Sequence, residues 1–302
     1  MLPYNWRTLS APVAAGLACA LAVLSAPTGN AAPTSWAAQR GVAPADDITP
    51  SWRCAGTGSD GNRIQLVYLR PAGAKDRFAE VRDKLESLAG YANGVYLASA
   101  AEQGGYRELR WATDTGQAGC RIDISRTELP EDKLKTASGM QAELRAKGYN
   151  RADRKYMVMI DHPTGTCGVA LPADNNDDRP GPDNANNSGN THAFGTTDVW
   201  GDYQCWGGDL LAHELTHTLG AVVETAPNAN PKAVDGHCLD AYELMCYDDK
   251  RAAPIREVCP KSHRGLLDCG QDDYFALKPK PGSWLAGHWN VANSDFLFKA
   301  PA

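Results

Sequence analysis

The sequence predicts an α+β domain in which a mixed sheet packs on helices. Alternating, β-branched or strongly apolar residues predict strands at 63–70, 108–113, 120–125 and 155–162. Apolar residues at helical spacing predict helices over 74–105 and 130–150. Strands that take turns with helices in this way favour a sheet covered by helices.

The long segment 171–192 interrupts this pattern. It is dense in Asp, Asn, Gly and Pro and contains almost nothing to bury, which predicts a loop. Calcium is a hard cation that takes oxygen ligands, and the loop has four candidates: Asp174, Asp177, Asp178 and Asp183. Their spacing is not that of an EF-hand, so a loop that is merely solvated is the alternative.

The C-terminal part is less periodic. Residues 224–282 contain four cysteines and little regular patterning, so we expect irregular structure held by disulfides. Residues 282–298 predict a closing helix. We interpret His162, His263 and His288 as packing or surface histidines.

The N-terminus has the features of a secretory signal. Arg7 is the only charge in residues 1–31, an apolar run follows it, and small residues surround a cleavage site near Ala31. The run is shorter than the roughly 20 apolar residues of a membrane span. We therefore expect a signal peptide at 1–31, a flexible leader at 32–50 and one folded domain at 51–302.

Charge and composition exclude some partners. Loss of the signal removes Arg7 and changes the formal net charge from −6 to about −7. No basic cluster suggests nucleic acid, and no second apolar run suggests a membrane. We expect a secreted monomer.

The cysteines predict disulfides. Cys19 leaves with the signal, and the eight that remain are an even number in an exported chain. Eight cysteines allow 105 pairings. Order along the chain suggests Cys54–Cys120, Cys167–Cys205, Cys238–Cys246 and Cys259–Cys269. A thiolate zinc site is the weaker alternative because no C-x-x-C pair occurs.

The segment LAHELTHTLG combines an apolar stripe with two histidines one helical turn apart. Leu211, Leu215 and Leu219 belong to the stripe. At 100° per residue, His213 and His217 fall on roughly the opposite side of the helix. The helix can therefore bury its leucines under the sheet and present both imidazoles to a cleft.

Two histidines at this spacing can bind one Zn²⁺, each at about 2.0–2.1 Å. Glu214 lies between them and is placed to take a proton from water that the metal activates, instead of binding the metal. A surface helix that contains these residues by chance is the alternative. Export, the apolar stripe and Gly220 favour the metal site.

The third metal ligand has to come from downstream, where DGHCLDAYELMCYDD offers three candidates. His237 supplies a nitrogen ligand, and Cys238 beside it can fix it through a disulfide. Asp240 is the second candidate. Glu243 would need a second helix to carry it, and the glycine and two cysteines of this segment argue against such a helix.

HELTHTLG followed by LMCYDD resembles the metzincin clan of zinc peptidases, with H-E-x-x-H-x-x-G and then a methionine turn. The chain is also similar to a group of secreted actinobacterial metzincin-like proteins. The resemblance covers residues 205–250 well and the rest in layout only. It implies a metzincin-like zinc-peptidase domain in which Met245 is the turn methionine. It also implies that Tyr247 is the tyrosine that, in astacin-like and serralysin-like members, stabilises the oxyanion.

The sequence departs from the metzincin pattern after the helix. That pattern places the third ligand three residues beyond the glycine, where this chain has Val223, which cannot bind a metal. His237 lies 17 positions after Gly220. Residues 221–236 would then be an inserted loop that leaves the metal and returns to it.

These features favour a secreted zinc endopeptidase that acts on protein or peptide substrates. Zinc would be the cofactor, with calcium as a further candidate, and Glu214 would serve as general base. The alternative is a catalytically inactive, metal-stabilised binding protein of the same fold. Glu214 argues against it, because a purely structural zinc needs no base and prefers four protein ligands.

Overall fold

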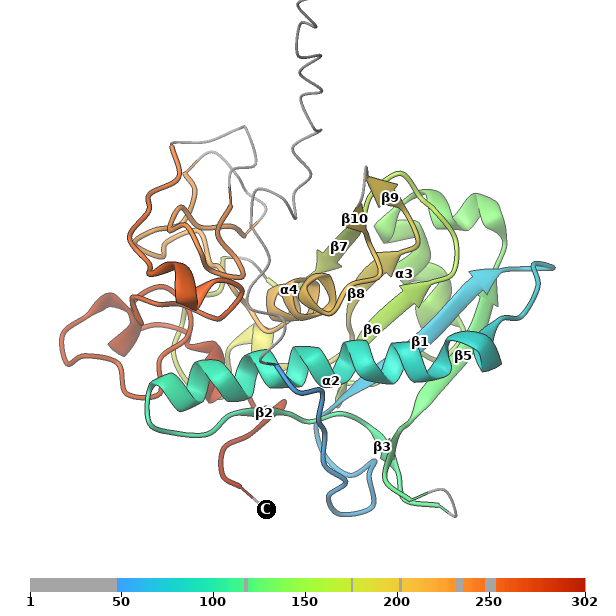
Figure 1. Cartoon of the computed structure of the whole chain (residues 1–302), viewed down its shortest axis with the longest axis horizontal. Coiled ribbons are helices and arrows are strands. Elements are labelled where there is room, and N and C mark those ends of the chain that lie inside the picture. Colours follow the sequence, from blue (N-terminus) through green and yellow to red (C-terminus); the bar gives the residue numbers. More distant parts are fainter. Residues whose placement is uncertain are drawn as a thin grey trace, which may run out of the picture. The chain divides into compact units, whose positions relative to one another are not determined.

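The computed structural model describes residues 48–301, apart from 117–118, 175, 201–202, 232–235 and 248–253. Its centre is a five-stranded sheet with the order β5-β1-β6-β8-β7 (Figure 1). The parallel strands are β1 (Arg63–Pro71), β5 (Ile124–Leu129), β6 (Arg154–Ile160) and β8 (Thr191–Thr196). The edge strand β7 (Gly168–Leu171) is antiparallel. The sheet is therefore mixed, and the predicted α+β class is confirmed.

Helices cover both faces of this sheet. Two of them, α2 (Phe78–Glu102) and α4 (Gly208–Thr218), pack against each other, and α4 also contacts β7 and β8. The opposite face carries η2 (Glu131–Lys135) and α3 (Ala137–Ala146). Alternate residues of β1 divide between the two layers, with Leu66 in the α2 and α4 core and Val67 in the α3 core.

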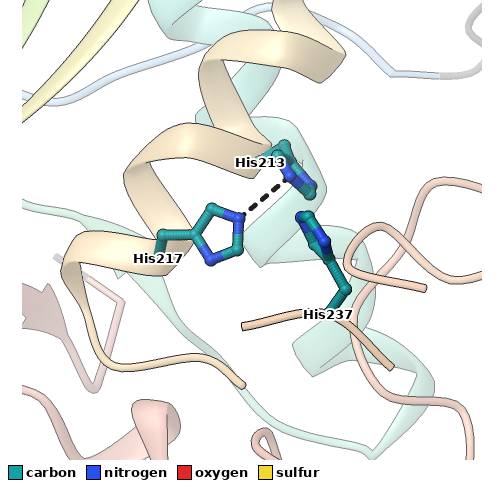
Figure 2. Close-up of side chains that lie close together, drawn as sticks. All are labelled: His213, His217 and His237. Carbon is teal, nitrogen blue, oxygen red and sulfur yellow. Dashed lines mark hydrogen bonds between the residues drawn. The ribbon is translucent and has the colours of Figure 1, made fainter. Parts of the chain in front are cut away.

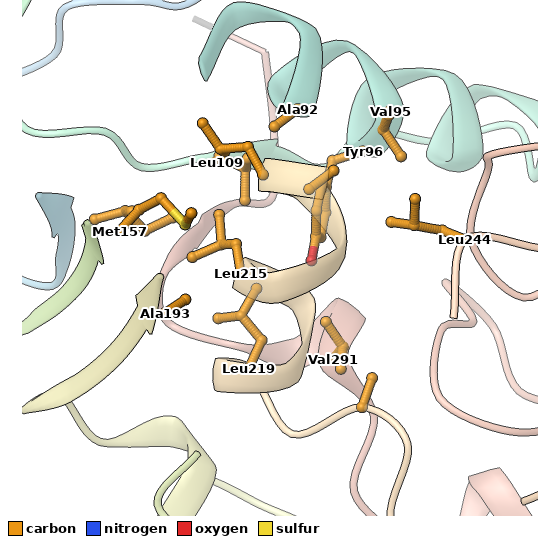
Figure 3. Close-up of a cluster of buried hydrophobic side chains, with 14 of the residues drawn as sticks. Ala92, Val95, Tyr96, Leu109, Met157, Ala193, Leu215, Leu219, Leu244 and Val291 are labelled. Carbon is orange, nitrogen blue, oxygen red and sulfur yellow. The ribbon is translucent and has the colours of Figure 1, made fainter. Parts of the chain in front are cut away.

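The larger core is built around the apolar side of α4. Figure 3 shows Leu215 and Leu219 of α4 between side chains of α2, the sheet and the C-terminal part, and all of these side chains are buried. Leu244 and Val291 reach this core from the C-terminal part of the chain. The leucine side of α4, the helix that carries the two predicted ligands, is therefore held by α2, the sheet and the C-terminal part together.

Short elements complete the fold. The two-residue strands pair as β2 (Glu108–Leu109) with β11 (Leu297–Phe298), β3 (Thr113–Asp114) with β4 (Arg121–Ile122), and β9 (Val199–Trp200) with β10 (Tyr203–Gln204). Single 3₁₀ turns are η3 (Ala185–Asn187), η4 (Lys261–His263), η5 (Trp284–Ala286) and η6 (Val291–Asn293). Of the helices in the described part of the chain, none combines the length and apolar character that a bilayer crossing requires.

The closing helix predicted at 282–298 is wrong. This segment consists of η5, η6 and β11, because its side chains bind the backbone of other segments. The Asn290 amide donates to the carbonyl of Ala276 at 2.6 Å and accepts from the N–H of Ala276 at 3.2 Å. Such bonds compete with helical ones.

Two other predicted elements differ in detail. The helix expected over 130–150 is split into η2 and α3, because Thr136 is extended and its hydroxyl accepts from the N–H of Gly139 as an N-cap. The end of the predicted loop 171–192 enters β8, a short strand that the sequence analysis missed. The expected signal peptide and most of the leader lie outside the described residues.

All four predicted disulfides are confirmed: Cys54–Cys120, Cys167–Cys205, Cys238–Cys246 and Cys259–Cys269. The last two lie in the C-terminal part, which contains short 3₁₀ turns and isolated bridges in place of long elements. A segment with so little regular structure gains from covalent links, which restrict its unfolded state.

Candidate metal centre

The helix α4 ends at a position that only glycine can occupy. Gly220 has a φ of 92°, and a Cβ there would lie 2.7 Å from Cβ of Asn186. The last carbonyls of the helix are satisfied from elsewhere in the fold. Lys155 donates to the carbonyl of Thr218 at 2.6 Å, and the Trp289 indole donates to that of Leu219 at 2.8 Å. The end that carries His217 is thus held in place.

The chain leaves the helix and returns to it. The N–H of Val222 donates to the carbonyl of Gly236 at 3.0 Å, and the N–H of Asn230 donates to that of His237 at 2.9 Å. The first bond joins the two ends of the intervening loop, and the second joins Asn230 in its middle to His237. They bring His237 next to the helix although it lies far along the sequence.

His213, His217 and His237 form one buried cluster. One ring nitrogen from each lies within 4.8 Å of the others. In Figure 2 the ring of His237 faces the two rings of α4 from the returning segment. The ring centroids of His213 and His237 are 5.3 Å apart, and those of His217 and His237 are 5.1 Å apart.

Backbone carbonyls fix the orientation of the two α4 imidazoles. Nδ1 of His213 lies 3.0 Å from the carbonyl oxygen of Leu244, and Nδ1 of His217 lies 2.8 Å from that of Ala221. A carbonyl can only accept, so both rings carry a proton on Nδ1. In neutral rings each Nε2 then presents a lone pair, and this is the arrangement by which metal-binding histidines are usually oriented.

The two Nε2 atoms fit a shared metal ion. They face each other at 3.0 Å, and two lone pairs at that distance repel unless a cation lies between them. Tetrahedral zinc with nitrogens at about 2.0–2.1 Å would place a pair of ligands about 3.3 Å apart. Together with His237, the cluster has the three nitrogen ligands typical of a zinc centre with one open position.

Glu214 lies on the same helix and approaches the edge strand β7. A Cβ added to Gly168 would lie 2.5 Å from Oε1 of Glu214, so glycine at that position leaves space for the carboxylate. Glu214 is 6% exposed. Its carboxylate therefore lies against Gly168, the first residue of the edge strand β7.

Tyr247 lies at the cluster. Its hydroxyl is 3.1 Å from Nε2 of His237, and the ring centroids are 4.5 Å apart. Its ring also lies 5.8 Å from that of His213, centroid to centroid. Met245, two residues earlier, is fully buried in the α4 core. The tyrosine thus reaches the histidines, while the methionine packs in the apolar core.

The other two candidates for the third ligand lie elsewhere. Asp240 pairs with Arg256 at 2.8 Å. Glu243 is 2% exposed and lies 3.2 Å from Sγ of both Cys246 and Cys259. Burial, followed by the charge of Asp268, raises the pKa of Glu243 well above its usual value. The structure brings neither carboxylate to the histidine cluster.

Two acids of the loop 171–192, Asp177 and Asp178, are engaged by other groups. Asp177 pairs with Arg179, which together with backbone N–H groups lowers the pKa of Asp177 to about 2. Asp178 accepts from the hydroxyl of Thr225. In the described parts of the chain, none of the four loop aspartates belongs to a cluster that could hold a metal.

The histidines expected to be structural also lie apart from the cluster. His263 pairs with Glu102 at 2.8 Å, and the ring of His288 stacks on that of Trp284. His162 lies 3.7 Å from Glu131.

Some contributors to the site were missed. The carbonyls of Ala221 and Leu244 orient the imidazoles, and Gly168 leaves space for the carboxylate of Glu214. A carbonyl has no signal in the sequence because every residue has one. The sequence shows a glycine at position 168, but it does not show that Glu214 lies next to it in the fold.

Comparisons with known proteins give distant structural matches. OgpA from Akkermansia muciniphila is 15% identical over 77% of this chain and 68% of OgpA, with a TM-score of 0.38. A catalytically inactive OgpA in complex with an O-glycopeptide substrate, glycodrosocin, is 13% identical over the same shares, with a TM-score of 0.39. Metalloproteinase-II from Bacteroides fragilis is 14% identical over 71% of this chain and 56% of its own, with a TM-score of 0.29. No protein-family model and no curated protein matches the sequence. Because these TM-scores lie below 0.5, the proposals below rest on this chain's own residues.

Proposed function

We propose that the chain is a secreted zinc endopeptidase whose ligands are His213, His217 and His237. The observation that carries the proposal is the pair of facing Nε2 atoms, fixed by carbonyls, with Glu214 between them in sequence. When bound, zinc lowers the pKa of water and polarises a carbonyl. A purely structural site would have little use for a carboxylate placed this way.

The remaining steps fall to the chain's own side chains. Glu214 accepts a proton from the attacking water and then delivers a proton to the leaving amine. Tyr247 donates a hydrogen bond to the oxyanion that develops on the substrate carbonyl. His213 and His217 keep their Nδ1 protons on the backbone carbonyls throughout, so their orientation does not change during turnover.

Location and partners are part of the same proposal. Disulfides persist in oxidising compartments and are rare in the cytosol. The four disulfides therefore favour export, with residues 1–31 as the signal and residues 51–302 as the catalytic domain. The substrate would be a protein or peptide, cleaved by a monomer.

Metal removal tests the proposal. We expect about one zinc per purified chain and cleavage of an unfolded protein such as casein. Incubation with 1,10-phenanthroline should remove both the zinc and the activity, and added Zn²⁺ should restore them. Zinc content is measured by mass spectrometry of the metal, and cleavage by the release of soluble peptides.

The isomer 1,7-phenanthroline, which does not chelate, is the matched control and should change neither quantity. A chain that holds zinc but cleaves none of a broad peptide library would support the inactive binding protein instead. Cleavage that survives complete loss of zinc would contradict the proposed mechanism.

The role of Tyr247 predicts a specific kinetic change. Tyr247→Phe keeps the ring that packs on His237 and removes only the hydroxyl. If that hydroxyl binds the oxyanion, kcat should fall roughly 10-fold to 1,000-fold with little change in KM, since the bond forms mainly in the transition state. Zinc content should stay the same. An unchanged kcat would leave Tyr247 as a packing residue below the substrate.

A further inference from the structure

The C-terminal part contains a second cluster of possible metal ligands. One carboxylate oxygen from each of Asp268, Asp272 and Asp273 lies within 4.8 Å of the others. Asp268 and Asp273 are each 1% exposed. The cluster consists of oxygen donors alone and shares no residue with the three histidines.

Backbone N–H groups hold these carboxylates in place. Asp268 accepts from the N–H groups of Asp272, Asp273, Tyr274 and Phe275, at distances between 2.7 and 3.1 Å. Oδ1 of Asp273 accepts from the N–H of Asn228 at 2.8 Å. Backbone hydrogen bonds within residues 268–275, and one from Asn228, therefore hold Asp268 and Asp273 in place without a bound ligand.

Two oxygens of the cluster lack any such bond. Oδ1 of Asp272 and Oδ2 of Asp273 are buried and have no hydrogen-bond partner among the described residues. The guanidinium of Arg256 donates to Asp240 and Asn228 and to neither of these two oxygens. Burying carboxylate oxygens without a partner costs free energy, and a cation removes that cost.

The surroundings of the cluster are acidic as well. Burial, followed by the charges of Asp268 and then Asp272, raises the pKa of Asp273 to about 8. Buried Glu243 interacts with Asp268 and Asp273 and adds to the same excess of acid groups. Oδ1 of Asp272 and Oδ2 of Asp273 come from adjacent residues and both lack a hydrogen-bond donor among the described residues. One cation that binds both oxygens would satisfy them.

We propose that Asp268, Asp272 and Asp273 bind a calcium ion. Calcium takes 6–8 oxygen ligands in flexible geometry, whereas magnesium demands a near-ideal octahedron that an irregular loop rarely supplies. Backbone carbonyls and water would complete the shell. Zinc prefers nitrogen and sulfur donors and would go to the histidines.

The ion would stabilise the segment behind the histidine cluster. The Tyr274 hydroxyl accepts from the N–H of Asp268 at 3.0 Å and lies 3.5 Å from Glu243. Leu244 follows Glu243 in the sequence, and its carbonyl orients His213. Calcium would thus act on stability and leave the chemistry at the histidines to other groups.

Calorimetric titration of the calcium-free, zinc-loaded full chain with CaCl2 tests the proposal. We expect one site with a dissociation constant on the order of 10⁻⁴–10⁻³ M, as in extracellular calcium modules, and weaker binding of MgCl2. Saturating calcium should raise the thermal midpoint by about 5 °C or more. Asp273→Asn should weaken binding by about 10-fold or more and remove the thermal shift.

The control variant is Asp183→Asn, at an exposed position of the loop 171–192, which should bind calcium like the wild type. Asp272→Asn provides a second variant of the cluster, and matched thermal midpoints in calcium-free buffer show that each variant is folded. No calcium-dependent heat in the wild type, or unchanged binding in both cluster variants, would overturn the site. Loss of binding in Asp183→Asn would move it to the loop. Neither readout involves proteolysis, so failure here leaves the zinc proposal unaffected.

Discussion

Glu214→Gln is expected to abolish peptide hydrolysis while the chain keeps its zinc. The substitution removes the group that accepts a proton and leaves a side chain of the same shape beside Gly168. General bases contribute about 10²- to 10⁴-fold to rates, so kcat should fall by that factor. Zinc should remain bound because His213, His217 and His237 are unchanged.

Turnover of a peptide substrate and zinc content, measured on the same samples, check this expectation. Glu224→Gln is the matched control, since Glu224 is an exposed glutamate ten residues further along the chain. It should change neither quantity. A Glu214→Gln variant that turns over at the wild-type rate would require a different base. If wild type and variant both bind zinc and both are inactive, the chain is a binding protein.

The regular parts of the fold were predictable because their patterns are local. Alternating and β-branched residues predict the strand at 63–70, and apolar residues at helical spacing predict the helix within 74–105; the structure has β1 and α2 there. The disulfides followed the order of the cysteines because each bridge joins two consecutive cysteines of the mature chain, over separations of 66, 38, 8 and 10 residues. The segment 282–298 has apolar residues at similar density, but its polar side chains donate hydrogen bonds to backbone carbonyls elsewhere in the chain. The apolar pattern of the sequence does not reveal such bonds.

The candidate site divides in the same way. The sequence indicates His213, Glu214 and His217 because they share one helical turn. It offered three candidates for the third position, and only folding places Asp240 on Arg256 and Glu243 on the cysteines. The carbonyls of Ala221 and Leu244 and the space at Gly168 arise from tertiary contacts alone.

His237→Ala is expected to lose most of the zinc. The two nitrogens of α4 would remain facing each other at 3.0 Å, but zinc sites in proteins use at least three protein ligands. Asp240→Ala should keep its zinc, because that carboxylate pairs with Arg256 away from the histidines. Both variants are dialysed against zinc-free buffer, and their metal content is compared with that of the wild type.

Misfolding would also lower the zinc content of His237→Ala, so its thermal midpoint is compared with that of zinc-depleted wild type. The two should agree, because ligand binding adds stability only when the ligand is bound. A midpoint well below that of the zinc-depleted wild type would mean that the imidazole is needed for packing. If His237→Ala instead keeps its zinc and Asp240→Ala loses it, the third ligand is Asp240. The Arg256 pair would then have to break when the metal binds.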